Sequence, residues 1–268
     1  MPDFLRVCEQ AARAGGKVLL DWQYRFQARE KGRNDLVTEA DLASQTAIKE
    51  ILLGTFPDHD FLGEEDASFA PMVAKPGEKS EYRWIVDPLD GTANYVHHLQ
   101  TFAVTIALEK AGEIILGVVF DPVSGEFYRA ELGRGAYLGE KRLQTSGCQT
   151  ADQAMVCVSF PPAVRRESQE VQWFIEALHT CQSVRRLGSA ALNLAYLSAG
   201  RLDSYWATSC KIWDVAAGLL MVREAGGAVS TIDGSPFDLN NPVFMASASA
   251  PLQTEMIKIL SGVAPSER

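Results

Sequence analysis

The chain has 268 residues, 47% of them hydrophobic, and a formal net charge of −9 at pH 7. This length suits one large domain or two lobes that share a core. No apolar run is long enough to cross a membrane, and Lys and Arg form no cluster larger than pairs such as 165–166 and 185–186. The composition therefore argues against a membrane protein and a nucleic-acid-binding protein. An acidic chain suits anionic substrates if bound metal ions invert the local charge.

The cysteines indicate the compartment. Their number is odd, they are widely scattered, and they form no Cys-x-x-Cys pair: Cys8, Cys148, Cys157, Cys181 and Cys210. This pattern favours reduced thiols and argues against a zinc site. The N-terminus lacks the charged, apolar and small-residue regions of a secretory signal. We therefore expect a cytoplasmic protein.

Hydrophobic spacing and turn residues divide the first half into helices followed by strands. The sequence predicts a helix at 4–22, a break at 32–36, a second helix opened by 38–41 and stopped at 56–57, and a short strand at 61–62. After these come a polar surface flap containing Pro71, Pro76 and Gly77, a buried strand at 84–86, and strands at 102–109, 114–120 and 126–131. The last three strands and their turns are typical of an antiparallel meander.

The second half alternates strands and helices, which predicts a layered α/β lobe. Its predicted elements are a strand at 155–160, a helix at 165–180, a strand at 184–187, a helix at 189–199, a strand at 202–207, a helix at 214–225, strands at 228–232 and 243–247, and a helix at 251–261. A soft boundary near residues 147–151 divides the single unit 1–268 into lobes 1–147 and 148–268.

The most informative segment is 84–95, where an apolar strand ends in Asp87 and Asp90, followed by Gly91 and Thr92. Open α/β sheets bind ligands at the carboxyl ends of their strands. Two nearby carboxylates repel unless a cation or a shared proton intervenes, and Mg²⁺ prefers such oxygen ligands. The same Asp-Pro-Leu-Asp-Gly string is also ordinary turn chemistry. This segment alone leaves both interpretations open.

Further acidic residues stand at the starts of other predicted elements. Asp41 lies three residues after Thr38 and could complete a capping box. The run 64–66 could be a solvated acidic turn, and Asp214 could simply begin a helix. Each structural explanation is reasonable singly. It is less reasonable to require all of these explanations at once beside Asp87 and Asp90.

Four motifs, in order, resemble those of the inositol monophosphatase family. They are Val37–Asp41, Gly63–Glu65, Asp87–Tyr95, and Trp213–Gly218 continuing through Glu224–Gly227. The resemblance covers essentially the whole chain. It implies an α/β (α+β) fold, a layered αβαβα sandwich with mixed and antiparallel sheets as in sugar phosphatases, in which one catalytic unit carries its active site between the two lobes. It also implies a homodimer.

The resemblance implies a magnesium-dependent, lithium-sensitive phosphatase and assigns roles to single residues. Two or three Mg²⁺ would be held by Glu64, Asp87, the Leu89 carbonyl, Asp90 and Asp214, with Asp87 bridging. The catalytic residues would be Asp41, Thr92 and Glu64, with Thr92 and Asp41 positioning and deprotonating the attacking water. Substrate contacts would come from Asp90, Gly91, Thr92, Gly188, Ser189, Ala190, Ala207 and Asp214.

The substrate implied by the resemblance is a small phosphorylated polyol or sugar such as inositol 1-phosphate. Ala207 departs from the pattern, because members that prefer inositol phosphates carry a glutamate there. Ala cannot accept hydrogen bonds from ring hydroxyls, so discrimination among polyols should weaken. Lys211 is either a surface lysine or a cation for a second anionic group. Fructose bisphosphate, histidinol phosphate and 3′-phosphoadenosine nucleotides are alternative substrates in related families.

Two rival functions remain. The haloacid dehalogenase motif Asp-x-Asp-Gly-Thr resembles 87–92, but this chain has one more residue between the two Asp residues. Because side chains alternate along extended backbone, that residue moves the second Asp relative to the first. The other rival is a non-catalytic regulatory module that binds Mg²⁺ or a phosphorylated ligand.

Overall fold

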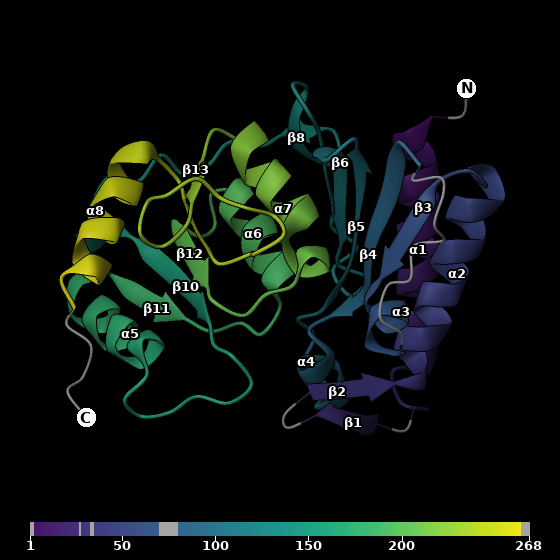
Figure 1. Cartoon of the computed structure of the whole chain (residues 1–268), viewed down its shortest axis with the longest axis horizontal. Helices are drawn as coiled ribbons and strands as arrows, with labels where there is room; N and C mark the ends of the chain where they lie inside the picture. Colours follow the sequence, from purple (N-terminus) through teal and green to yellow (C-terminus); the bar gives the residue numbers. More distant parts are fainter. Residues whose placement is uncertain (1–2, 27, 33–34, 70–79, 264–268) are drawn as a thin grey trace.

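The computed structural model describes residues 3–26, 28–32, 35–69 and 80–263. Its layers follow the order helix, sheet, helix, sheet, helix along the long axis of the molecule (Figure 1). This confirms the predicted αβαβα sandwich. The helices of the three helical layers are α1 (Phe4–Trp22) with α2 (Glu39–Thr55), α6 (Ala190–Ser198) with α7 (Ile212–Glu224), and α5 (Gln169–Thr180) with α8 (Ala250–Ser261).

The first sheet has seven strands in chain order. They are β3 (Asp60–Gly63), β4 (Tyr82–Asp90), β5 (Ala103–Lys110), β6 (Glu113–Phe120), β7 (Phe127–Glu131), β8 (Gly135–Leu138) and β9 (Lys141–Arg142). β3 pairs with β4 in parallel, and every later pair is antiparallel. The predicted meander is therefore confirmed.

The second sheet has five strands in the order β11-β10-β12-β14-β13. Their bounds are β10 (Met155–Ser159), β11 (Ser183–Arg185), β12 (Ser204–Ala207), β13 (Ala228–Ser230) and β14 (Phe244–Ser247). β10 runs parallel to β11 and β12, whereas β14 is antiparallel to both β12 and β13. The sheet is mixed, as predicted for this half.

Some elements were not predicted. A two-stranded hairpin, β1 (Ala28–Gly32) and β2 (Asp35–Thr38), lies where the sequence predicted a break. Its strands were not predicted because this charged and glycine-containing sequence lacks the alternation of apolar and polar residues that is typical of a strand. β8 and β9 were also missed, and a short 3₁₀ helix spans Ala151–Gln153. The acidic run at 64–66 begins helix α3 (Glu64–Phe69) instead of forming a turn. The flap expected around Pro71 to Gly77 lies outside the described residues.

Alternation along β4 decides where its carboxylate points. Trp84 and Val86 are buried in an apolar cluster with α1 and α2, whereas Ile85 belongs to a cluster with α6 and α7. Asp87 has the same parity as Ile85, so its side chain faces the α6–α7 layer. It lies opposite Thr105 of β5, and a register irregularity follows between Asp87 and Asp90.

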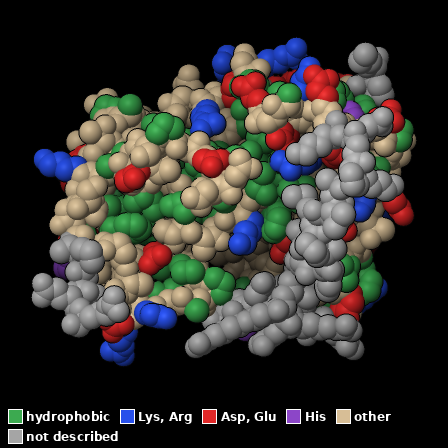
Figure 2. All heavy atoms as spheres, in the orientation of Figure 1, with side chains coloured by type: hydrophobic (Ala, Val, Ile, Leu, Met, Phe, Trp, Pro, Cys, Tyr) green, Lys and Arg blue, Asp and Glu red, His purple; other side chains and the backbone are tan. Residues whose placement is uncertain are grey.

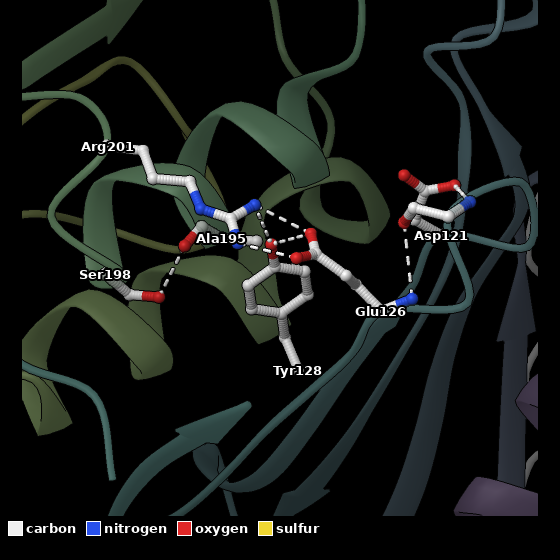
Figure 3. Close-up of polar contacts among 7 residues, drawn as sticks. Asp121, Glu126, Tyr128, Ala195, Ser198 and Arg201 are labelled. Atoms are coloured by element: carbon white, nitrogen blue, oxygen red, sulfur yellow. Dashed lines mark hydrogen bonds and ion pairs between the residues drawn. The ribbon is translucent and has the colours of Figure 1, made fainter. Parts of the chain in front are cut away.

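The α6–α7 layer joins the two halves of the chain. A Cβ at Gly117 of β6 would lie 2.7 Å from the Cα of Ala217, so α7 packs directly on the first sheet. Beyond the end of α6, the Arg201 guanidinium donates to both carboxylate oxygens of Glu126 at 2.6 and 2.7 Å (Figure 3). The Tyr128 hydroxyl donates to Glu126 at 2.5 Å. Apolar and ionic contacts therefore both cross the predicted lobe boundary.

Across the described ranges, no helix combines the length and the apolar character needed to cross a bilayer.

Candidate active site

Asp41 is both a helix cap and a site residue. Its Oδ2 accepts hydrogen bonds from the Thr38 N–H at 2.9 Å and from the Thr38 hydroxyl at 2.6 Å. The predicted capping box is thus present at the start of α2. The other oxygen, Oδ1, lies 3.5 Å from the hydroxyl of Thr92. The structure therefore brings Asp41 and Thr92 together across 51 residues of sequence.

The surroundings of Asp41 tune its proton affinity. The pKa of Asp41 is raised to about 7, chiefly by burial and also by the carboxylates of Glu65 and Glu64, against the opposing hydrogen bonds from Thr38. A carboxyl group with such a pKa can accept or release a proton near neutral pH.

The segment after Asp87 is a turn, as one of the two interpretations predicted. Asp87 Oδ1 accepts a hydrogen bond from the Leu89 N–H at 2.9 Å, which is local Asx-type turn chemistry. The Ser44 hydroxyl of α2 donates to the Pro88 carbonyl at 3.0 Å. The Thr92 hydroxyl donates to the Leu89 carbonyl at the same distance. The turn holds Asp87, Leu89 and Thr92 in one fixed arrangement.

Gly91 makes the tight end of this turn. Its φ is +94°, in the left-handed region, and it precedes the short helix α4 (Thr92–Val96). A Cβ at this position would lie 2.9 Å from the carbonyl oxygen of Thr101. Both the backbone conformation and the space therefore require glycine.

Asp90 is held by the opposite half of the chain. Its Oδ2 accepts hydrogen bonds from the Ser189 hydroxyl and, at 2.9 Å, from the Ala191 N–H. Its Oδ1 accepts from the Ala190 N–H at 3.1 Å. The N-terminal end of α6 therefore binds the Asp90 carboxylate through backbone N–H groups, as helix N-termini commonly bind anions.

Glu64 and Asp214 complete the acidic set. Glu64 begins α3 immediately after β3 ends at Gly63, where a Cβ would lie 2.2 Å from Gln45 Oε1. Asp214 lies in the first turn of α7, and its Oδ2 accepts from the Lys211 N–H at 2.7 Å. The helix-start interpretation of Asp214 is therefore confirmed.

The acidic side chains influence one another strongly. Burial raises the pKa of Asp87 well above its usual value, and the charges of Glu64, Asp90 and Asp214 raise it further. Burial likewise raises the pKa of Asp214, reinforced by Asp90. Burial raises the pKa of Asp90 to about 6, although the hydrogen bonds from the start of α6 oppose this. The structure therefore brings these carboxylates near one another.

These carboxylates fit a hard cation. Among the residues that the structure describes, no ion pair includes Asp87, Asp90 or Asp214. Buried like charges without a cationic partner are costly, and carboxylate and carbonyl oxygens suit Mg²⁺. Within the described ranges, however, no three His, Cys, Asp or Glu side chains are already drawn around one point as a complete metal site. The cluster is electrostatically suited to a metal but is not a preformed coordination shell.

The predicted substrate residues divide into two groups. Gly188, Ser189 and Ala190 lie at the start of α6 beside Asp90, close to Gly91. Ala207, at the end of β12, has 0% exposure and packs among Tyr205, Leu194 and Phe244. Its substrate role stays a prediction, and a larger side chain there would displace apolar neighbours.

Sequence reasoning missed several supporting residues. Ser44 and Gln45 of α2 are buried polar residues, and Gln45 Oε1 accepts from the Glu65 N–H at 3.1 Å. Both follow Asp41 at helical spacing on the face that also buries Ile48, and this spacing is the signal that could have identified them.

Cys210 does not provide a nucleophile. Burial raises the pKa of its thiol well above the ordinary value, and the charge of Asp214 raises it further. A protonated thiol is a weak nucleophile. Cys210 is partly buried and packs against the apolar cluster that includes Val215 and Leu219, as a small hydrophobic residue would.

A cavity lies beside the start of α7. Its volume is about 630 Å³, and its lining includes Arg83, Thr208, Lys211, Trp213 and Pro242. Figure 2 shows this face of the molecule hollowed beside the α6–α7 layer. Because Lys211 and Trp213 precede Asp214, this cavity adjoins the carboxylate cluster. Its size suits a small molecule.

The inositol monophosphatase family model matches residues 3–263 of the chain. This chain belongs to the inositol monophosphatase family. The protein is accordingly an enzyme, a phosphoric monoester hydrolase. An inositol-1-monophosphatase of Mesorhizobium japonicum is 40% identical over 243 residues, covering 88% of each chain.

Further relatives share the same family architecture. A fructose-1,6-bisphosphatase/inositol-1-monophosphatase of Aquifex aeolicus is 37% identical over 242 residues, covering 89% of each chain. The crystal structure of extragenic suppressor protein suhB from Bartonella henselae aligns with a TM-score of 0.89 at 33% identity. That alignment covers 97% of this chain and 99% of the other.

Proposed function

We propose that this inositol monophosphatase family member is a magnesium-dependent phosphatase that hydrolyses a small phosphate monoester resembling inositol 1-phosphate with a metal-activated water. The observation that carries the proposal is the convergence of buried carboxylates beside the Thr92–Asp41 pair. The proposed metal ligands are Glu64, Asp87, the Leu89 carbonyl, Asp90 and Asp214. Two or three Mg²⁺ held there would neutralise phosphate charge and lower the pKa of a bound water.

Thr92 and Asp41 are the proposed route for the proton of the attacking water. The Thr92 hydroxyl has one proton, which it donates to the Leu89 carbonyl in this structure. Turned toward Asp41 Oδ1, which lies 3.5 Å away, that proton would leave the hydroxyl oxygen free to accept a hydrogen bond from water. Burial raises the pKa of Asp41 to about 7, so its carboxylate can take up a proton near neutral pH. Glu64 is proposed as the third catalytic residue, acting beside the water.

Substrate binding is proposed at the junction of the two halves. The backbone N–H groups of Gly91 and Thr92 would hold the phosphate. The alcohol part would lie toward the cavity that adjoins Asp214. The substrate contacts that the family resemblance implies are Asp90, Gly91, Thr92, Gly188, Ser189, Ala190, Ala207 and Asp214.

Fructose bisphosphate is the second candidate substrate, because the Aquifex relative is named for both activities. Lys211 supports this alternative, since it is exposed and lines the cavity, where it can meet a second phosphate. Ala207 supports it too, because its methyl group offers no hydrogen bond to an inositol ring. The preferred substrate therefore depends on which alcohol part the cavity accepts.

We also propose a cytoplasmic homodimer without a nucleic-acid partner. All five cysteines are free in the structure, which suits a reducing compartment. The homodimer rests on the family resemblance. Light scattering after size exclusion would test it, and a monomer mass would refute it.

A panel of phosphate monoesters tests the proposed function. Purified protein would be assayed for phosphate release with Mg²⁺ and with excess EDTA, using inositol 1-phosphate, glycerol phosphate, fructose 1,6-bisphosphate, histidinol phosphate and a 3′-phosphoadenosine nucleotide. We expect release that requires Mg²⁺ and is inhibited by lithium. Release from none of these substrates would favour the regulatory-module alternative. A covalent phosphoaspartyl adduct at Asp87 would instead favour the haloacid dehalogenase type of mechanism.

A further inference from the structure

The start of α6 is bound to Asp90, although 99 residues separate Ser189 from it in the sequence. The Ser189 hydroxyl and the Ala190 and Ala191 N–H groups all donate to the Asp90 carboxylate. Ser189 is 1% exposed, and its oxygen also accepts the Leu192 N–H at 3.2 Å as the helix cap. The Ser189 hydroxyl therefore donates one hydrogen bond and accepts another, both with groups inside the protein.

Asn94 clamps the same two segments. Its side-chain amide donates to the Leu187 carbonyl at 2.8 Å and to the Thr101 carbonyl at 2.7 Å. Gly188 lies against this amide at φ +84°, where a Cβ would come within 2.8 Å of Asn94 Oδ1. The clamp fixes residues 187–191 relative to Asp90.

The hydrogen bonds leave a defined part of Asp90 available. A carboxylate has about four lone-pair sites, two on each oxygen. Oδ2 uses both of its sites for Ser189 and Ala191, whereas Oδ1 uses one for Ala190. Oδ1 is therefore the oxygen with an acceptor site left for a cation.

We propose that Ser189 is a positioning residue that fixes Asp90 for metal binding, and that it does not contact the substrate. The proposal rests on the proposed magnesium-dependent function. It differs from the substrate contact that the family resemblance implies for Ser189. Without the hydroxyl, Oδ2 regains a free site and the carboxylate can rotate. Loss of a residue that orients a metal ligand typically weakens metal affinity about 10- to 100-fold.

Calorimetric titration of the substrate-free protein with Mg²⁺ tests the proposal. Ser189→Ala should bind Mg²⁺ about 10- to 100-fold more weakly than the wild type, and Ser189→Thr should restore most of the affinity. Ser198→Ala is the matched control, because Ser198 is also buried on α6 but donates to the Ala195 carbonyl (Figure 3). It should bind Mg²⁺ like the wild type.

Kinetics on the best substrate of the panel provide the second readout. Ser189→Ala should require more Mg²⁺ for half-maximal activity while its KM at saturating Mg²⁺ stays unchanged. Unchanged Mg²⁺ affinity with a raised KM would overturn the proposal and make Ser189 a substrate contact. Ser189→Gly also removes the hydroxyl and suits a helix cap, so it replaces the Ala variant if thermal unfolding shows that variant to be misfolded. A wild type that binds no Mg²⁺ would refute the proposed function itself.

Discussion

Gly91→Ala should damage both the stability and the activity of the protein. Gly91 has a φ of +94°, and an alanine in the left-handed region costs about 1–2 kcal/mol. Its Cβ would lie 2.9 Å from the Thr101 carbonyl oxygen and 3.3 Å from the Gly188 carbonyl oxygen. These are backbone atoms that no side-chain rotation can move, so overpacking adds about 1–3 kcal/mol. We expect a total loss of about 2–5 kcal/mol in the free energy of unfolding.

Gly125→Ala is the matched control. Gly125 also has a positive φ, +76°, but nothing lies within 4 Å of the position where its Cβ would stand. It should therefore lose only the conformational cost of about 1–2 kcal/mol. Because Gly91 joins Asp90 to Thr92, its variant should also lose phosphatase activity, whereas the control should keep it.

Urea unfolding and phosphate release at saturating Mg²⁺ provide the two measurements. The difference between the two variants isolates the clash from the strained φ. Equal stability losses, together with equal activities, would refute the inference that the Thr101 and Gly188 backbones confine Gly91.

Other changes should separate chemistry from stability. Thr92→Ala should lower kcat about 10²- to 10⁴-fold by removing the hydroxyl beside Asp41, and Thr92→Ser should keep most of the activity; equal kcat values would exclude this proton route. Glu126→Gln should lose about 1 kcal/mol of stability at neutral pH. The hydrogen bond from Arg201 lowers the pKa of Glu126, so this loss should be full above the unfolded-state value of about 4.3 and vanish as the folded carboxylate protonates at lower pH. A difference in urea stability that persists in acid would contradict the assignment. Cys157, whose pKa burial raises to about 11, should react with a thiol reagent at pH 7.5 only after unfolding; rapid labelling of the native protein would show that it is accessible.

Periodicity predicted the layers because most elements bury one continuous face. The 19-residue helix α1 matches the predicted range 4–22, since its apolar residues repeat at helical spacing. The hairpin of β1 and β2 had no such pattern, so it was missed. The start of β12 at Ser204, two residues after the predicted strand start at 202, is the kind of boundary that hydrogen bonding decides and composition does not.

The candidate site was predictable where turn chemistry and helix starts coincide with acids. Asp41, Asp87 and Asp214 each carry a local capping or turn hydrogen bond, as the helix-cap and turn interpretations of the sequence predicted. The hydrogen bond from Ser189 to Asp90 could not be predicted from the local sequence pattern, because it joins segments that are far apart in the chain. The burial of Ala207 could not be predicted from the sequence either, since a residue at the end of a strand can be exposed or buried.

In the proposed function, the clustered carboxylates bind the Mg²⁺ that is needed for hydrolysis of a phosphate monoester. The most direct measurement compares the wild type with Asp87→Asn for Mg²⁺ binding by calorimetry and for Mg²⁺-dependent phosphate release. The substitution removes one charge from the buried cluster while keeping the size and one oxygen of the side chain. We predict a folded variant with weakened Mg²⁺ binding and nearly abolished turnover. A variant that binds Mg²⁺ and releases phosphate like the wild type would contradict the account.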